Sequence, residues 1–599
     1  MGGEAGSSTW SPKAVRSLRN WLNECIESHH DCKNIFKSTL PKRFIDVNPY
    51  DTDIEAPVTV DDINSLSIDA MPHVKLRLTA GLPDDTEYLT LSHCWGKSIP
   101  IKLQNDLLPI FEDMIPVTDL LKAEAKVFRE AICVTRCLGY RYLWIDALCI
   151  NQDDDGEKAA EISRMDEIFS GAAANLSATA ASSGAEGMFF AREHNLYELL
   201  PCAWEKPTRN QERQDYFVAH MDREDPNREP ANKRAWIYQE RILAPRVIHF
   251  CKNQIYRECA QESLDELHDC IPWIIPPKYN PQAYVKRHGQ DVSGDKDRKE
   301  HWYDQFDTLM VLYSDSILTF PQDRLPSFAG IAKAISVHSG LAQDQYLAGI
   351  WKGDLPRALL WYAWYRGSRN GGRRWDPEHV GYISPSWSWA GCEAPQIRVR
   401  VDPGRPFEGL AEVTRVWTVP AILDGSPFGA LSDGGMTLKG MLVEIHRKRI
   451  GEGFLILIHD GDAQFKDALY FEPSWPPTAR ECGKRPEGHF KEIEIYWDRG
   501  EKQFERDCFP PWQVDASLDS GFWDEVDPEV LYLLPVGQCP SMGEAKETHL
   551  MGLVLERDDT TGRFKRVGNF STYTEDPKGV NDEVRLRLLK SRKLEVTIV

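Results

Sequence analysis

Hydrophobic and polar positions in the first half of the chain follow two periods in turn. Tyr88 to Ser92 is a short apolar run typical of a buried strand, and from Leu121 onward apolar side chains return every three or four positions, as on one face of a helix. Tyr142 to Asp146 and Ala174 to Ala180 are two further short runs, with another helical pattern between them. Because strands and helices alternate, we expect a mostly parallel sheet with helices on both faces.

Polar side chains stand where these strands end, and open α/β sheets place their ligand sites at the carboxyl ends of strands. His93 follows the first strand and Asp146 ends the second. Further along, Trp236 to Leu243 has the pattern of a helix, and two short strands are predicted after it, at 246–250 and 254–258. We therefore place a candidate site at the ends of the first two strands.

The pattern changes in the second half of the chain. A polar and charged stretch, 282–300, has the composition of an exposed connection, and 303–336 is partly helical. From about residue 380, short apolar runs are separated by Gly, Pro and Asp, which favours β structure. The sequence thus predicts four parts, which are a flexible N-terminus (1–19), an N-terminal domain (20–270), a connecting, partly helical region (271–380) and a β-rich C-terminal region of mixed α+β character (381–599).

Composition narrows the class of protein. The 599 residues are 42% hydrophobic and 27% charged, which suits a globular protein with a large core. No apolar run approaches the roughly 18 residues of a membrane span, and residues 1–11 lack the features of a signal peptide, so we expect a cytoplasmic protein with reduced thiols. The net charge of -21 opposes binding to nucleic acid.

Three blocks carry a family resemblance. They are LSHCWG at Leu91–Gly96, LWIDALCINQDD at Leu143–Asp154 and KRAWIYQERILAPRVIHF at Lys233–Phe250. In this order they resemble the fungal heterokaryon-incompatibility (HET) family of self/non-self recognition and cell-death proteins. The segments 21–47 and 385–390 resemble the lead-in and the downstream region of long family members.

Small departures accompany the resemblance. His93 stands where many family members carry Tyr, and Ala147 and Ala244 stand where Ser is frequent. A mechanism that needs a hydroxyl at these three positions is therefore not expected here.

The resemblance implies a fold and a chemistry. The HET domain is thought to be distantly similar to the TIR domain, which implies a TIR-like (flavodoxin-like) sheet in the N-terminal domain. Some TIR domains cleave NAD with a Trp and a Glu spaced as Trp-x-x-x-Glu on a helix, a spacing that Trp236 and Glu240 share. The resemblance then implies Glu240, Asp146 and His93 as catalytic residues. The residues implied to bind NAD, as a substrate rather than a cofactor, are Trp95, Trp236, Arg234 and Arg241.

Structural roles for the same residues stay open. Glu240 could pair with Arg234, Arg241 or Arg246, and Asp146 could cap a helix or satisfy the core. Two tryptophans near the strands, Trp95 and Trp144, suit core packing as well as stacking on a ligand.

A metal site is not predicted. Cys25-x3-His29-x2-Cys32 contains zinc-type ligands, as does Cys133-x3-Cys137, but the second pair falls on an amphipathic helix and the paired-knuckle spacing of structural zinc is missing.

The function expected is that of an intracellular incompatibility protein whose output is programmed cell death. As an enzyme it would be an NAD glycohydrolase. Two alternatives remain open. In the first, the protein is a non-catalytic module that binds a protein partner, such as an allelic incompatibility protein or a second copy of itself. In the second, it is a HET-domain member recruited to another role such as specialised metabolism. Trp387 and Trp389 lie in an apolar segment, and we expect both to be buried.

Overall fold

The computed structural model divides the chain into two compact units, 1–291 and 292–599, and each is described on its own. The structure describes residues 8–32, 39–51, 73–96, 101–192, 225–266, 295–363, 373–375, 377–393, 397–401, 405–422, 425–450, 453–458, 468–471, 493–497, 529–540, 548–572, 591 and 593–599. None of the helices in these residues is long and apolar enough to cross a membrane. The four-part division made from the sequence stays a prediction.

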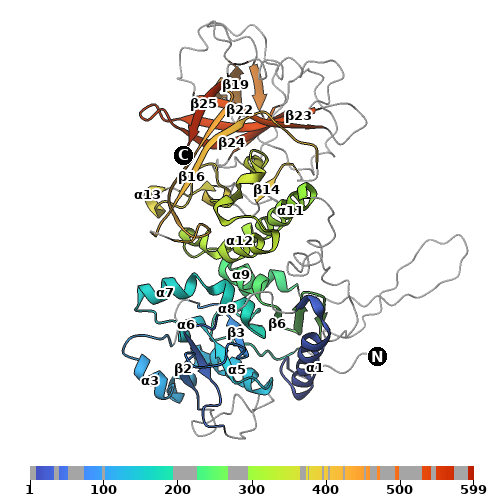
Figure 1. Ribbon diagram of the computed structural model, residues 1–599, viewed down its shortest axis with the longest axis vertical. Coiled ribbons are helices and arrows are strands. Elements are labelled where there is room, and N and C mark those ends of the chain that lie inside the picture. The colour runs from blue at the N-terminus through green and yellow to red at the C-terminus, as the bar shows by residue number, and fades with distance from the viewer. Residues whose placement is uncertain are drawn as a thin grey trace, which may run out of the picture. The chain divides into compact units, whose positions relative to one another are not determined.

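A sheet with eight strands in the described residues forms the middle of the N-terminal unit (Figure 1). Its order is β2-β1-β4-β3-β5-β6-β7-β8. The strands are β1 (Arg43–Asp46), β2 (Lys75–Leu78), β3 (Tyr88–Ser92), β4 (Tyr142–Trp144), β5 (Ala174–Ser177), β6 (Arg246–Phe250), β7 (Ile255–Cys259) and β8 (Ser263–Asp265).

The α/β character predicted for this unit is confirmed, but the sheet is mixed rather than mostly parallel. Only the central strands β4, β3, β5 and β6 run parallel to one another. β1 and β2 pair antiparallel on one side, and β7 and β8 do so on the other. The short turns between β6, β7 and β8 can only reverse the chain, since a parallel return needs a long crossover.

Helices surround this sheet. They are α1 (Pro12–Ser28), α3 (Leu108–Asp113), α4 (Val117–Leu120), α5 (Lys126–Cys137), α6 (Asp146–Cys149), α7 (Asp155–Ile162), α8 (Met165–Gly171) and α9 (Ala235–Leu243). The chain goes from β3 to β4 in one direction and then back past β3 to β5 and β6. Because such crossovers are right-handed, α5 lies on one face and α7 to α9 on the other. The reversal of direction makes the ends of β3 and β5 the switch point of the sheet.

Local chemistry sets several of these helix ends. Ser11 caps α1 by accepting from the Ala14 amide (3.2 Å), and Pro12 opens the helix, so α1 begins inside the stretch that the sequence analysis expected to be flexible. Asp154 caps α7 by accepting from the Glu157 amide (2.9 Å). Gly139 follows α5 with φ +87°, a conformation that glycine adopts without strain.

The C-terminal unit is rich in β structure, as predicted. It begins with the helices α11 (Asp295–Ser314) and α12 (Pro326–Ser339). A sheet with eleven strands in the described residues follows. Its longer strands are β16 (Glu412–Pro420), β17 (Leu431–Met441), β18 (Val443–Ile450), β19 (Gly453–Ile458), β22 (Glu529–Pro540), β23 (Thr548–Arg557), β24 (Phe564–Thr572) and β25 (Lys593–Ile598). Nearly all neighbouring strands in it are antiparallel, with β24 and β25 the parallel pair among those described.

Tryptophans form much of the core of this unit. Trp387 and Trp389 are buried, which confirms the expectation, and the Trp389 indole donates to the Gly349 carbonyl (2.7 Å). Trp361 is equally buried and donates to the Trp387 carbonyl (2.8 Å), while the Arg566 guanidinium stacks on its ring. These rings hold the core together and offer no stacking surface for an external ligand.

Candidate active site at the strand ends of the N-terminal unit

The turn after β3 carries His93 and Trp95 to the carboxyl end of the sheet. Gly96 ends this turn with φ +70°, and a Cβ at that position would lie 2.9 Å from the Ser183 Cβ. A glycine therefore lets the turn pack against the segment that follows β5.

Asp146 lies beside this turn because it is the first residue of α6, two positions after β4 ends. The Trp95 indole donates to Asp146 Oδ2 (2.9 Å), and the Ala147 amide donates to Oδ1 (2.7 Å). His93 Nδ1 lies 3.9 Å from Asp146 Oδ1. Asp146 thus accepts a hydrogen bond from an amide in the first turn of α6 and also lies beside both His93 and Trp95.

Glu240 reaches the same place from the second turn of α9. Its carboxyl is buried and accepts a hydrogen bond from the Ser92 hydroxyl, the last residue of β3. The Asn175 amide donates to Ser92 Oγ (2.9 Å), and Thr90 donates to the Asn175 carbonyl oxygen (3.1 Å). A chain of buried hydrogen bonds therefore runs across β3 and β5, at the switch point, and ends on Glu240.

Burial decides the charge state of this carboxyl. Burial and, to a smaller extent, the nearby Asp146 carboxylate raise the pKa of Glu240 to about 8, against smaller opposing effects of Ser92 and Arg234. No ion pair joins Glu240 to a cation among the described residues. At neutral pH the carboxyl is mostly protonated.

His93 is buried as well, and burial lowers its pKa, so its imidazole is neutral. The Phe128 ring packs edge-on against it at 5.1 Å. In the described part of the chain its Nε2 atom has no hydrogen-bond partner, although it is shielded from solvent. An unpartnered nitrogen of this kind is an unusual feature that a ligand or a water could satisfy.

Arg234 brings a positive charge to the site. It is the residue before α9, its side chain is partly exposed, and its charge acts on His93, Cys94 and Glu240. Asp146 and Trp95 are also partly exposed. The site therefore has an outer part, formed by these three residues, and a buried inner part with Glu240 and His93.

Two of the residues implied to bind NAD, Arg241 and Trp236, have contacts outside this site. Arg241 turns away from Glu240 and makes two hydrogen bonds to Glu258, at 2.6 and 2.8 Å, and one to Asn227 (2.7 Å). Trp236 lies one helical turn before Glu240 on α9, and its ring packs against the main core of the unit. The structure thus brings together five of the seven sequence-predicted residues, which are Glu240, Asp146, His93, Trp95 and Arg234.

The alternative ion pairs of Glu240 are not formed. Arg241 is occupied by Glu258, and Arg246 binds the Ala173 carbonyl (3.1 Å) and Cys25 Sγ (3.1 Å). Two members of the site, Ser92 and Asn175, were missed from the sequence. Ser92 was within a recognised motif, and its position as the last residue of a strand was the signal that could have identified it.

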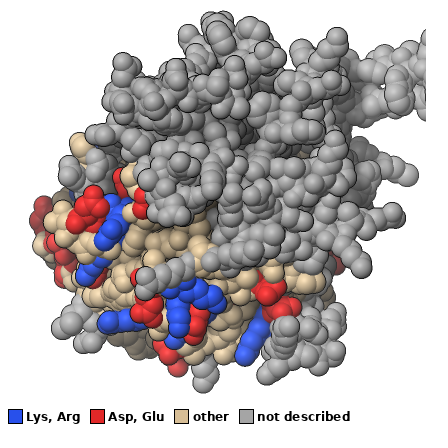
Figure 2. Space-filling view, turned by 90° about the horizontal axis from the view of Figure 1, so that it is seen from above, with Lys and Arg blue, Asp and Glu red and all other residues tan. Residues whose placement is uncertain are grey.

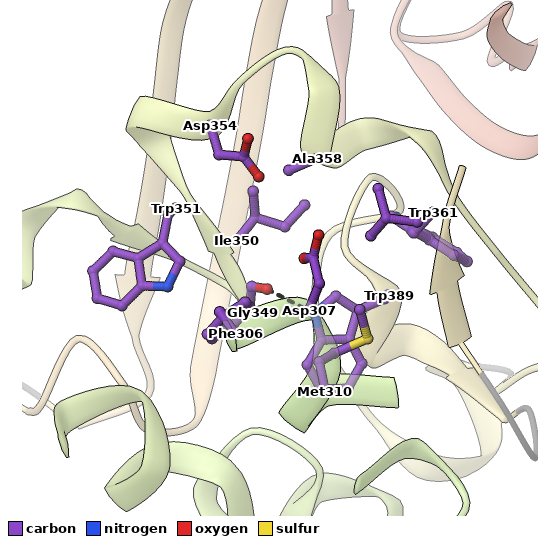
Figure 3. Close-up of a pocket in the computed structure, with 11 residues that line it drawn as sticks. Phe306, Asp307, Met310, Gly349, Ile350, Trp351, Asp354, Ala358, Trp361 and Trp389 are labelled. Carbon is purple, nitrogen blue, oxygen red and sulfur yellow. Dashed lines mark hydrogen bonds between the residues drawn. The ribbon is translucent and has the colours of Figure 1, made fainter. Parts of the chain in front are cut away.

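A small cavity in the C-terminal unit has a different character (Figure 3). Its walls include Phe306, Ile350 and Trp389, together with the carboxylates of Asp307 and Asp354. Both carboxylates bind the Arg357 guanidinium, whose single positive charge balances one of the two negative charges. With a volume of about 10 Å³, it has room for about one water molecule, so it is a packing gap between core rings.

Figure 2 shows the charged side chains on one face of the molecule. Over the described part of this face, Lys and Arg side chains lie among Asp and Glu side chains and do not gather into one basic area. That part of the surface lacks the concentrated positive charge with which proteins bind phosphate backbones.

The N-terminal unit is therefore an α/β domain with a polar site at the carboxyl ends of its parallel strands. Residues 88–240 match the family model of the heterokaryon incompatibility protein (HET), so the chain carries a HET domain. The match begins with β3 and ends at Glu240, and it contains the five residues that meet in the site. No curated protein and no solved structure gave a match.

Proposed function

We propose that this protein acts in heterokaryon incompatibility inside the cell, with the N-terminal unit as effector and the C-terminal unit as the part that responds to a protein partner. The HET match supports the role. The four parallel strands lie in the order β4-β3-β5-β6, so the second strand in the chain lies beside the first at one edge of the group. Flavodoxin-like sheets have this order, which supports a TIR-like fold for the N-terminal unit. The output is growth arrest or programmed cell death.

We further propose that the effector cleaves NAD at the Glu240 site. The observation that carries this proposal is the meeting of two carboxyl groups, Glu240 and Asp146, with the unpartnered His93 nitrogen and the Arg234 cation at the switch point. A negative group facing the ribose stabilises the cation-like transition state of glycosidic cleavage. Arg234 is placed at the outer part of the site, where it suits the pyrophosphate.

The reaction balances without a cofactor. The bond between ribose C1′ and the nicotinamide nitrogen breaks, and its electron pair cancels the positive charge of the ring. Water adds to C1′ and releases a proton, so the products are nicotinamide and ADP-ribose. The positive nicotinamide ring favours the ionised form of the nearby Glu240, whose carboxylate then faces the ribosyl cation.

The test compares wild-type protein with Glu240→Gln, which keeps the size of the side chain and removes its charge. NAD consumption by the purified full-length proteins should fall about 10²–10³-fold, by analogy with the loss of one oxyanion-hole contact. Cell killing at matched protein amount should fall with it. Normal killing by a folded Glu240→Gln protein would remove the enzymatic proposal.

A non-catalytic interaction module is the second candidate, and one observation favours it. Glu240 is buried and already bonded to Ser92, so a substrate reaches it only if the surrounding loops move. If the second candidate is right, the exposed residues Trp95 and Arg234 serve a protein partner. Arg234→Ala should then reduce killing while Glu240→Gln leaves it unchanged.

A further inference from the structure

Three cysteines and one histidine meet at the side of the sheet where α1 lies beside β6 (Figure 1). Cys25 is in the last turn of α1, His29 follows that helix, and Cys32 ends a short 3-10 turn, His30–Cys32. The fourth member, Cys259, is the last residue of β7 and lies 230 positions beyond His29 in the sequence. The fold therefore adds a distant ligand to a local motif.

The spacing of the four side chains suits one metal ion. Their ligand atoms, three Sγ and one imidazole nitrogen, all lie within 4.8 Å of one another. His29 Nδ1 is 3.4 Å from Cys259 Sγ and 3.9 Å from Cys32 Sγ. In a tetrahedral zinc site with bonds of about 2.3 Å to sulfur and about 2.0 Å to nitrogen, these atoms stand about 3.5 Å apart.

Neighbouring groups are arranged as around a metal. His29 points Nδ1 at the sulfurs, and its other nitrogen, Nε2, lies 3.9 Å from the Glu262 carboxylate. The Trp21 indole holds that carboxylate with a 2.9 Å hydrogen bond. Ligating histidines commonly have a carboxylate on the side away from the metal, because it fixes the ring and its tautomer.

Arg246 supplies the matching charge. Its Nε donates to Cys25 Sγ (3.1 Å), and its two other nitrogens bind the Ala173 and Cys32 carbonyls. Three thiolates around a divalent ion carry a net charge of minus one, which one guanidinium neutralises. The three cysteines are buried and are not joined by disulfides, so each can supply a thiolate to a metal ion.

We propose that Cys25, His29, Cys32 and Cys259 form a structural zinc site. The ion takes all four ligands, so it has no open position for catalysis. Binding releases three thiol protons, while His29 binds in its neutral form. Soft sulfur ligands select zinc over magnesium or calcium.

The zinc site links the end of α1 to the end of β7. In the sequence, three ligands precede β1 and the fourth follows β6. Arg246, which contacts Cys25, is the first residue of β6 and comes three positions after the end of α9. Zinc therefore fixes the end of the segment that positions Glu240. The site is independent of the chemistry proposed above and stands or falls with its own test.

The first experiment needs no substitution. Full-length protein, purified without added metal or chelator, should contain one zinc per chain by elemental analysis. X-ray absorption at the zinc edge should show three sulfur neighbours at about 2.3 Å and one nitrogen at about 2.0 Å. Absence of zinc, together with a disulfide between two of the three cysteines found by mass spectrometry, would overturn the proposal, as would three unmodified thiols in a folded, zinc-free protein.

Variants then assign the ligands. Cys259→Ser should lose the zinc, whereas Cys133→Ser, which changes an equally buried cysteine on α5, should keep it. In case Cys259→Ser does not fold, Glu262→Gln offers a milder change. It should keep the fold and weaken zinc binding about 10–100-fold in competition with a chelator. Unchanged zinc affinity in Glu262→Gln and unchanged zinc content in Cys259→Ser would both contradict the assignment.

Discussion

Two glutamates of the N-terminal unit, Glu240 on α9 and Glu258 on β7, are buried to the same extent and have opposite electrostatic settings. Glu258 accepts two hydrogen bonds from the Arg241 guanidinium and lies 3.2 Å from His249 Nε2. The Arg241 charge, with a smaller contribution from His249, holds the pKa of Glu258 far below its usual range, although burial acts against it. Glu240 accepts a hydrogen bond from the Ser92 hydroxyl and forms no ion pair within the described residues. Burial, with a further contribution from Asp146, raises its pKa to about 8.

The difference separates a structural carboxylate from a reactive one. In an ion pair such as Glu258 with Arg241 each charge is already balanced, so a charged ligand would gain no electrostatic energy by binding there. A buried carboxyl without a cation keeps unfavourable electrostatics that a positively charged substrate can relieve, and such groups gather at functional sites. Glu240 therefore remains the stronger catalytic candidate, because Arg241, its neighbour in the sequence, binds Glu258 instead.

The largest effect is expected from breaking the ion pair. Glu258→Gln leaves the buried Arg241 charge uncompensated, and we expect a loss of about 3–5 kcal/mol in the free energy of unfolding. Urea denaturation followed by tryptophan fluorescence measures it. Glu240→Gln is the matched control and should cost far less at pH 7, because the carboxyl that it replaces is already neutral. Equal losses in the two variants would show that both glutamates are structural.

The second prediction concerns pH. The folded pKa of Glu240, about 8, lies above its unfolded value near 4.5. Its contribution to stability is therefore fully present below pH 4.5 and is lost as the pH rises toward 8. The stability of wild type relative to Glu240→Gln should fall across this window, by at most about 1.4 kcal/mol per pH unit. A flat difference between pH 5 and pH 8 would show that the pKa of Glu240 is not raised.

The contrast between these glutamates was only half visible in the sequence. Glu240 and Arg241 were both assigned to the NAD site, but adjacent residues on a helix point about 100° apart and cannot easily meet one ligand. The different directions of Glu240 and Arg241 could therefore have been predicted from the sequence. The partner of Arg241 could not have been predicted, because it depends on how the hairpin of β6 and β7 packs beside α9.

Strand positions were predictable where local pattern decides them. The runs at Tyr142 and Ala174 became β4 and β5, and the ends of β3 and β4 delivered His93 and Asp146 as expected. Strand direction was missed at both sides of the sheet because it follows from pairing between distant segments. Only the fold could supply Cys259 to the motif around Cys25 for the same reason.

A smaller effect is expected at the hydroxyl that holds Glu240. Ser92→Ala removes the donor to Glu240 and the acceptor of the Asn175 amide, which should cost about 1–3 kcal/mol. Because the Ser92 hydrogen bond lowers the pKa of Glu240, the pKa should rise in the variant. Thr90→Val is the control, since it interrupts the same chain of hydrogen bonds without touching Glu240. The pH at which stability falls should move upward in Ser92→Ala alone.

The smallest and most specific effect is expected from Asp146→Asn. The Asp146 charge raises the pKa of Glu240, so its removal should lower that pKa. The pH window over which the stabilising contribution of Glu240 is lost should then move downward, and the acid limb of the pH profile of any NAD-cleaving activity should move with it.

Asp153→Asn, on the exposed loop after α6, removes an equal charge and is the matched control. The asparagine oxygen still accepts from Trp95 or Ala147, so the turn should keep its shape. If the window moves equally in both variants, the effect is one of overall charge, and Asp146 and Glu240 do not act as a pair. If it moves only in Asp146→Asn, the two carboxyls share one electrostatic site, unlike Glu258, whose charge is balanced by Arg241.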